Sequence, residues 1–290
     1  MCAIHQPNLF PRLSTLAKLL AADRWIVLDD VQFARRDYQH RARLSALDDP
    51  DRQQWLTLST HLSHGRGTLI RDAVLAEPER CRKRLAGLIR QHYGRSRHWH
   101  VVRDVLLSVL DEFDTTDRLA DVTEASTRAL LHALGWNGEV LRSSALPSRD
   151  GRSERLADLA ALTGSTHYLC GTGGLRYVEY GPFDAHGISV VPFHTPVDNN
   201  RISVWRGVRR ISALWVLASI GPEELVSQAA SQPEEALALL APVPGAREWR
   251  KPRPKPEKPQ LTATPGSKAG ARPHAAGPRS PATRAAVGRH

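Results

Sequence analysis

The sequence carries a short polar motif, HQPN, at His5–Asn8, whose side chains could do chemistry. A histidine can serve as a general acid or base, or it can bind a phosphate, so His5 is a candidate catalytic residue. The side-chain amides of Gln6 and Asn8 could orient a ligand. The motif could equally be a turn, in which Pro7 fixes the chain and Asn8 caps the next helix.

A second polar motif, LDDVQF, spans Leu28–Phe33 and contains two adjacent carboxylates after an apolar run. In a loop the two carboxylates can diverge. Asp29 or Asp30 could then activate a hydroxyl or amine, or bind a ribose hydroxyl or a metal, while the other pairs with an arginine such as Arg36. Gln32 is a further candidate for substrate binding. The alternative is a solvated acidic loop.

A basic segment, RRDYQHRAR, follows at Arg35–Arg43. Guanidinium groups bind phosphate or carboxylate with two parallel hydrogen bonds, so Arg36 and Arg41 are candidate phosphate-binding residues. A basic strand face with an aromatic side chain could also hold a nucleotide. The alternative is a charged loop that leads into a strand.

The fourth cluster is CGTGG at Cys170–Gly174. Glycines after a strand allow the backbone N–H groups to approach an anion, which makes Gly171, Gly173 and Gly174 candidate substrate-binding residues. The spacing matches neither the dinucleotide-binding nor the P-loop pattern. A tight turn explains the glycines as well, and Cys170 fits a buried thiol better than a nucleophile.

The elements around the first two motifs indicate an α/β domain. A strand is expected at Cys2–His5, an amphipathic helix at about Leu13–Ala22, and a buried strand at Trp25–Leu28. If the two strands are parallel neighbours, His5 and Asp29 leave the sheet at the same carboxyl edge, where ligands bind in open α/β sheets.

The rest of the chain predicts a Rossmann-like open sheet with a helical middle segment. Two strand-like runs lie within residues 41–60. Helices are expected at about Pro78–Tyr93, Trp99–Phe113, Asp117–Leu134, Ser153–Thr163 and Ser203–Ile220, and further strands at Glu139–Arg142, His167–Cys170 and Gly187–Phe193.

The net charge of +10 is concentrated at the C-terminal end of the 290-residue chain. Residues 242–290 hold 11 Lys+Arg, two Asp+Glu and 10 of the 20 prolines, so residues 1–241 are nearly neutral. We therefore expect an α/β domain at residues 1–241 and a basic, Pro-rich disordered tail at 242–290. The tail favours a solubilising role, and nucleic acid is expected to bind only weakly through it.

Composition excludes several other classes of protein. No apolar run is long enough to span a membrane, and the first residues lack the pattern of a signal peptide. Three widely spaced cysteines make no disulfide framework, so we expect reduced thiols in a cytoplasmic protein. No spacing of Cys, His and carboxylates is typical of a zinc site, so no metal is expected, and no motif identifies a cofactor.

Together these motifs resemble the WbqC-like protein family. The segment Ile4–Phe33, IHQPNLFPRLSTLAKLLAADRWIVLDDVQF, pairs an HQPN-type start with an LDDVQF-type strand end. The resemblance continues through shorter pieces and covers about residues 3–220; the pieces are WLTL at Trp55–Leu58, LGW at Leu134–Trp136, SERLADL at Ser153–Leu159 and YLCGTGG at Tyr168–Gly174. The chain departs from the family pattern at Arg12, where an aromatic is usual, at His40–Ala42, and in HTPVDNNRIS after Phe193.

The resemblance implies a biosynthetic enzyme of polysaccharide, O-antigen or small-molecule pathways. The expected activity is that of a transferase that modifies a nucleotide-activated sugar or transfers an acyl or aminoacyl group to an amine. The expected partner is thus a small-molecule substrate, which could be nucleotide-linked. The alternative is a non-catalytic partner or scaffold protein of a biosynthetic complex, which would bind another protein instead.

Overall fold

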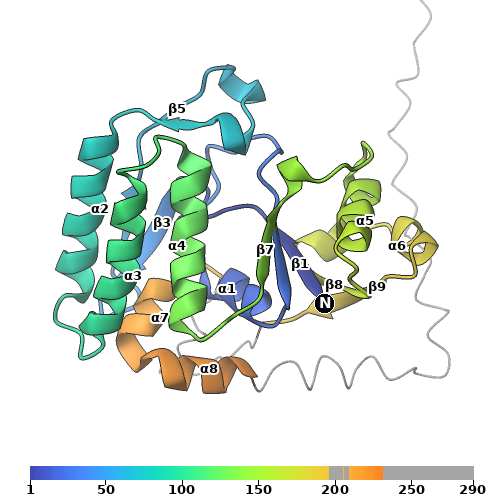
Figure 1. Ribbon diagram of the computed structural model, residues 1–290. Helices are drawn as coiled ribbons and strands as arrows, with labels where there is room; N and C mark the ends of the chain where they lie inside the picture. Colours follow the sequence, from blue (N-terminus) through green and yellow to red (C-terminus); the bar gives the residue numbers. More distant parts are fainter. Residues whose placement is uncertain (196–204, 206–208, 231–290) are drawn as a thin grey trace, which may run out of the picture. The chain divides into compact units, whose positions relative to one another are not determined.

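A five-stranded parallel sheet forms the centre of the computed structural model, which describes residues 1–195, 205 and 209–230 (Figure 1). The strand order is β7-β2-β1-β8-β9, and each neighbouring pair is parallel. The strands are β1 (Cys2–His5), β2 (Arg24–Val27), β7 (Glu139–Arg142), β8 (His167–Gly171) and β9 (Ser189–Phe193). The predicted Rossmann-like open sheet is confirmed.

Helices cover both faces of this sheet. On one face, α1 (Leu13–Leu20), which connects β1 to β2, packs into a large apolar cluster that includes Ala3 of β1. On the other face, α5 (Arg152–Leu162) and α6 (Gly181–Ala185) form a second cluster with the other side of β1. The chain therefore winds in one direction from β1 to β2 and β7, and then returns to the opposite side of β1 to form β8 and β9. This reversal places the topological switch point between β1 and β8.

The alternation of side chains along β1 decides which face His5 occupies. Cys2 and Ile4 belong to the cluster with α5 and α6, whereas Ala3 belongs to the cluster with α1. Because successive strand side chains point to opposite faces, His5 lies on the same face as Ala3, toward α1. His5 pairs with Val27 in a parallel register, so the prediction that β1 and β2 end at one edge of the sheet is confirmed.

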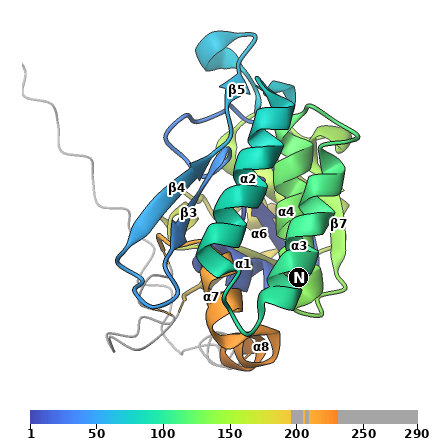
Figure 2. The ribbon, with the colours of Figure 1, turned by 90° about the vertical axis from the view of Figure 1, so that its left-hand side faces the viewer.

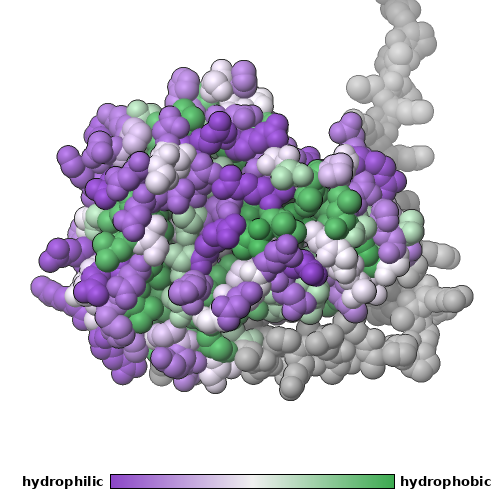
Figure 3. Space-filling model, viewed as in Figure 1, coloured by the Kyte–Doolittle hydropathy of each residue, from purple (hydrophilic) through white to green (hydrophobic). Residues whose placement is uncertain are grey.

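A long insertion between β2 and β7 forms the helical middle segment that the sequence predicts. It contains α2 (Pro78–Tyr93), α3 (Trp99–Glu112) and α4 (Leu119–Ala133), whose outward surface is mostly hydrophilic (Figure 3). An antiparallel hairpin of β3 (Arg41–Ser45) and β4 (Gln53–Thr57) lies beside α2 (Figure 2). The remaining short elements are β5 (Thr60–His61), β6 (Val74–Leu75) and the 3₁₀ turns Gly65–Gly67, Ile70–Asp72, Ser143–Ala145 and Gly174–Arg176.

The predicted helix Ser203–Ile220 is confirmed over Ala213–Ile220 and wrong for residues 209–212. Residues 209–212 form a turn and a bridge, and α7 spans only Ala213–Ile220. Ser212 ends the non-helical stretch because its hydroxyl accepts a hydrogen bond from the Leu214 N–H and caps the helix. A further helix, α8 (Pro222–Ala230), begins at a proline just after Gly221 and was not predicted.

The two tryptophans assigned to that helix are nevertheless core residues. Trp205 and Trp215 are both buried, and the Trp215 indole N–H donates to the carbonyl of Ala46. All three cysteines are buried, and none is bonded to another. Within the described ranges, no helix is long and apolar enough to cross a membrane. The expected tail and its boundary at residues 241 and 242 lie outside the described residues.

Candidate functional site

A crevice of about 360 Å³ opens at the carboxyl ends of β1 and β8. It lies at the topological switch point, where open α/β sheets bind their ligands. Its walls are the ends of β1 and β8, the first two turns of α1, and the Gly171–Gly174 loop. The residues that line it are Ile4, His5, Arg12, Ser14, Thr15, Lys18, Tyr168, Gly171, Thr172, Gly173, Gly174, Phe193, Thr195 and Arg209.

The lining of the crevice is positively charged. Lys18, Arg12 and Arg209 contribute cations, and none of the described lining residues is Asp or Glu. Four hydroxyl side chains, those of Ser14, Thr15, Thr172 and Thr195, add hydrogen-bond donors. The amino end of α1 also lies at this wall, and the partial positive charge of a helix amino end attracts anions. The arrangement favours a phosphate or carboxylate ligand.

Lys18 is the most unusual residue of the crevice, because it is only 5% exposed. Its ammonium donates one hydrogen bond to the Ile4 carbonyl at 3.2 Å, and an ammonium has two further donors to offer. Burial lowers the pKa of Lys18 to about 8, so the side chain remains mostly protonated at neutral pH. A buried lysine without a carboxylate partner is expensive, and a bound anion would compensate its charge.

His5 is held in a defined protonation state. Its Nδ1 lies 2.8 Å from the Gln6 carbonyl, which can only accept, so Nδ1 carries the hydrogen and Nε2 keeps its lone pair. Burial, followed by the positive charge of Lys18, lowers the pKa of His5 to about 3. His5 is therefore neutral at physiological pH and can accept a proton through Nε2.

Hydrogen bonds from helix α4 hold the HQPN loop in place. The Asn8 carbonyl accepts hydrogen bonds from the hydroxyls of Ser126 and Thr127, each at 3.2 Å. The Phe10 N–H contacts the Ser126 oxygen at 2.9 Å, and this fixes Phe10 in a left-handed conformation with φ of 40°. A bulky residue rarely adopts that conformation, so the packing of α4 determines the path from His5 to α1.

The sequence of residues 6–224 matches the WbqC-like protein family. The chain belongs to this family. It is also 25% identical over 222 residues to the uncharacterized protein Rv1507c of Mycobacterium tuberculosis, a match that covers 76% of this chain and 94% of the relative. No solved structure gives a significant match.

In this WbqC-like protein the two amides of the HQPN motif have different surroundings. The Gln6 side-chain oxygen accepts a hydrogen bond from Gln39 at 2.8 Å, which ties the loop to the segment before β3. Asn8 is buried, and its side-chain oxygen is without a hydrogen-bond partner among the described residues. Neither residue lines the crevice, and their role in substrate binding stays a prediction.

Asp29 and Asp30 lie one strand away from the crevice. The two oxygens of Asp29 accept hydrogen bonds from the Ser144 N–H at 3.0 Å and the Ser144 hydroxyl at 2.7 Å. Asp30 pairs with Arg155, and the Ser143 hydroxyl lies between the two carboxylates. The two serines follow β7, on the far side of β2 from β1, and Arg155 lies on α5, so neither carboxylate lines the crevice with His5. Their catalytic role stays a prediction.

The predicted binding residues of the basic segment also lie outside the crevice. Arg36 is exposed, and its carbonyl accepts from Arg41, whose guanidinium lies 4.3 Å above the Trp55 ring. The exposed Gln32 side chain donates to the Arg66 carbonyl. These three residues are therefore not brought together with His5.

The three predicted glycines do line the crevice. Gly173 is exposed and a Cβ there would meet open space, so its backbone is accessible to a ligand. A Cβ at Gly174 would stand 2.8 Å from the Cys170 sulfur, so this position requires a glycine. Burial raises the pKa of the Cys170 thiol, which disfavours the nucleophilic thiolate.

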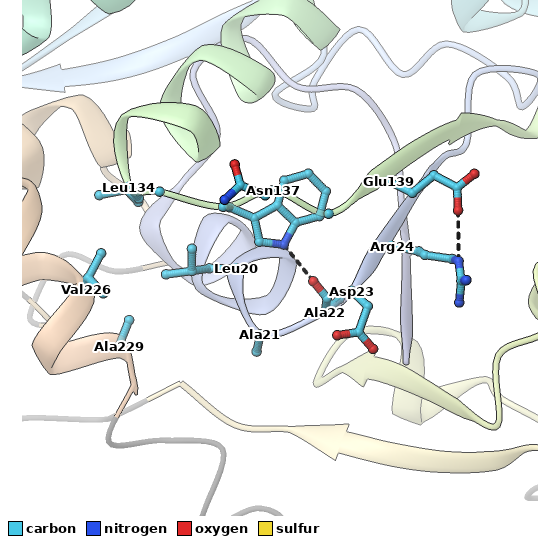
Figure 4. Close-up of a pocket in the computed structure, with 13 residues that line it drawn as sticks. Leu20, Ala21, Ala22, Asp23, Arg24, Leu134, Asn137, Glu139, Val226 and Ala229 are labelled. Carbon is cyan, nitrogen blue, oxygen red and sulfur yellow. Dashed lines mark hydrogen bonds and ion pairs between the residues drawn. The ribbon is translucent and has the colours of Figure 1, made fainter.

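A larger cavity, of about 670 Å³, lies at the opposite, amino edge of the sheet (Figure 4). Its charged groups already have partners, since Arg24 pairs with Glu139 at 2.9 Å and Asp23 with the amino terminus at 2.6 Å. It offers no unpaired charge among its described lining residues. The described residues also contain no group of three His, Cys, Asp or Glu side chains that could hold a metal.

Four features of the crevice were not predicted from the sequence: Lys18, Arg12, Arg209 and the hydroxyls of α1. For Lys18 a signal existed, because it is the one charge within the otherwise apolar and hydroxyl-bearing helix LSTLAKLL. A charged residue on a buried helix has to meet a partner or a ligand. Arg209 gave no such signal, because only the folded chain brings it beside α1.

We predict that Lys18→Met raises the pKa of His5 above about 3. After burial, the positive charge of Lys18 is the largest cause that lowers this pKa. The measurement is an NMR titration of the His5 ring, assigned by comparison with His5→Gln. Lys83→Met, at an exposed lysine of α2, is the matched control and should leave the His5 pKa unchanged. An unchanged His5 pKa in Lys18→Met would contradict the electrostatic coupling.

Proposed function

We propose that this WbqC-like protein is a biosynthetic transferase whose donor substrate carries a phosphate or other anion bound in the crevice. The donor is a nucleotide-activated sugar or an activated acyl or aminoacyl group, and the acceptor is a hydroxyl or an amine. The observation that carries the proposal is the crevice itself, in which Lys18 is buried with no acidic neighbour among the described lining residues. The polysaccharide pathway and the cytoplasmic location stay predictions.

In the proposed reaction, each group of residues in the crevice has a separate role. Lys18 and Arg12 bind the anionic group of the donor and stabilise the negative charge that grows on it as the bond to the transferred group breaks. The backbone of the Gly171–Gly174 loop contacts the same anion. His5 accepts the proton of the attacking hydroxyl or amine at Nε2. A bound anion offsets the charge of Lys18, so it raises the His5 pKa and makes His5 a stronger base.

Binding is tested on the full chain with UDP-glucose, acetyl-CoA, ATP and inorganic pyrophosphate by isothermal titration calorimetry. We expect at least one probe to bind, and Lys18→Met to weaken it about tenfold or more, because a charge-assisted hydrogen bond contributes about 1.5–3 kcal/mol. Lys83→Met again serves as the control. Binding that is unaffected by Lys18→Met would move the site away from the crevice, and no binding by any probe would favour the scaffold alternative.

Catalysis is tested with the donor that binds. The chain is incubated with that donor and a mixture of amines and amino sugars, and mass spectrometry detects the transferred group. His5→Gln should keep the donor affinity and lower the rate of product formation by about 10²–10⁴-fold, as is typical when a general base is removed. A His5→Gln variant with the full rate would show that another group accepts the proton.

A further inference from the structure

We propose that the nucleoside part of a nucleotide-linked donor binds on a strip of guanidinium and aromatic groups that continues the crevice outward. This guanidinium–aromatic strip consists of Arg12, Tyr38, Arg41, Arg43 and Trp55. The inference rests on the proposed function and narrows its donor to a nucleoside diphosphate derivative. The phosphates lie in the crevice, and the base stacks on the strip.

Arg12 joins the crevice to the strip. It lines the crevice, and its guanidinium carbon lies 4.3 Å from the centre of the Tyr38 ring. Both side chains are held by the same short segment, because Arg12 donates to the Arg209 carbonyl at 3.2 Å and the Tyr38 hydroxyl donates to the Arg210 carbonyl at 3.4 Å. Arg12 therefore contacts both the crevice and the first ring of the strip.

The strip continues from Tyr38 to the hairpin of β3 and β4. The ring centres of Tyr38 and Trp55 are 5.6 Å apart. The guanidinium groups of Arg41 and Arg43 lie 4.3 and 4.4 Å from the centre of the Trp55 ring. The contacts form one continuous series that runs from Arg12 through the two rings to Arg41 and Arg43.

The hairpin register explains why these side chains share one face. Arg43 stands directly opposite Trp55, and side chains alternate between the two faces of a hairpin. The intervening residues Ala42, Leu44 and Leu56 are buried in the core, so the arginines and the tryptophan face outward. All five side chains of the strip are half-buried, which fixes them in place while leaving surface for a ligand.

The chemistry of the strip suits a nucleoside better than another anion. Bases stack on aromatic rings and on guanidinium planes, and cations beside them attract the phosphates. The nearby Asp37 carboxylate is engaged, since it accepts the Tyr38 N–H at 2.8 Å.

The dimensions of the crevice point the same way. At about 360 Å³ it lies at the small end of the range for ligand pockets, so the phosphates and the transferred group of a nucleotide-linked donor occupy it and the base lies outside. A nucleic acid chain is a poorer match, because one end of the strip meets a crevice of only about 360 Å³ and a long strand would need a continuous groove.

The test compares UDP and inorganic pyrophosphate as probes on the full chain by isothermal titration calorimetry. We expect wild type to bind UDP more tightly than pyrophosphate. Tyr38→Leu and Trp55→Leu should weaken UDP by about 5- to 150-fold, the effect of losing a stacked base, and change pyrophosphate by less than about twofold. Tyr180→Leu is the matched control, because Tyr180 is an exposed tyrosine just before α6 and does not line the crevice.

A double variant, Arg41→Gln with Arg43→Gln, keeps Trp55 in place and tests the strip even if the aromatic variants fail to fold. It should weaken UDP and leave pyrophosphate unchanged within about twofold. Equal affinities of wild type for UDP and pyrophosphate, or UDP binding that survives all the strip variants, would overturn the inference and leave the crevice proposal standing. If Lys18→Met left the affinities for UDP and pyrophosphate unchanged, that result would instead overturn the proposed function.

Discussion

The sheet grows from β1 first toward β2 and β7 and then, on the other side, toward β8 and β9, and the rest of the structure depends on this reversal in strand order. Connections leave β1 toward β2 on one side, and the chain returns to β8 on the other, so among the described residues no crossover helix covers the gap between β1 and β8 at their carboxyl ends. The HQPN loop and the Gly171–Gly174 loop therefore meet across an open crevice. The alternation of β1 then points His5 toward α1, and α1 brings Lys18 to the same place.

This geometry buries the Lys18 ammonium beside His5, and that burial costs free energy. The positive charge of Lys18 and the low polarity of its surroundings keep His5 neutral, and burial itself lowers the pKa of Lys18. Both shifts are relieved when an anion enters, because the anion stabilises the protonated forms. The site thus gains affinity for an anion from the same electrostatic cost that it carries when no anion is bound.

The strands and helices around this site were predicted well from the sequence, because strong hydrophobic periodicity defines them. The run CAIH, the helix that follows it and Pro78–Tyr93 have patterns that local physics alone explains. The sequence could not decide the partners of Asp29. Its carboxylate meets Ser144, 115 residues away, and that contact exists only because β7 pairs with β2. Likewise, the position of Arg209 and the late start of α7 at Ala213 depend on the bridge between Arg12 and Ser212. This bridge is a tertiary contact.

The position of a bound anion tests the account most directly. A crystal structure of the full chain with inorganic pyrophosphate should show it in the crevice, within hydrogen-bond distance of the Lys18 ammonium and the backbone N–H groups of the Gly171–Gly174 loop. Pyrophosphate bound at another surface, with the crevice containing only water, would contradict the claim that the switch point between β1 and β8 is the functional site.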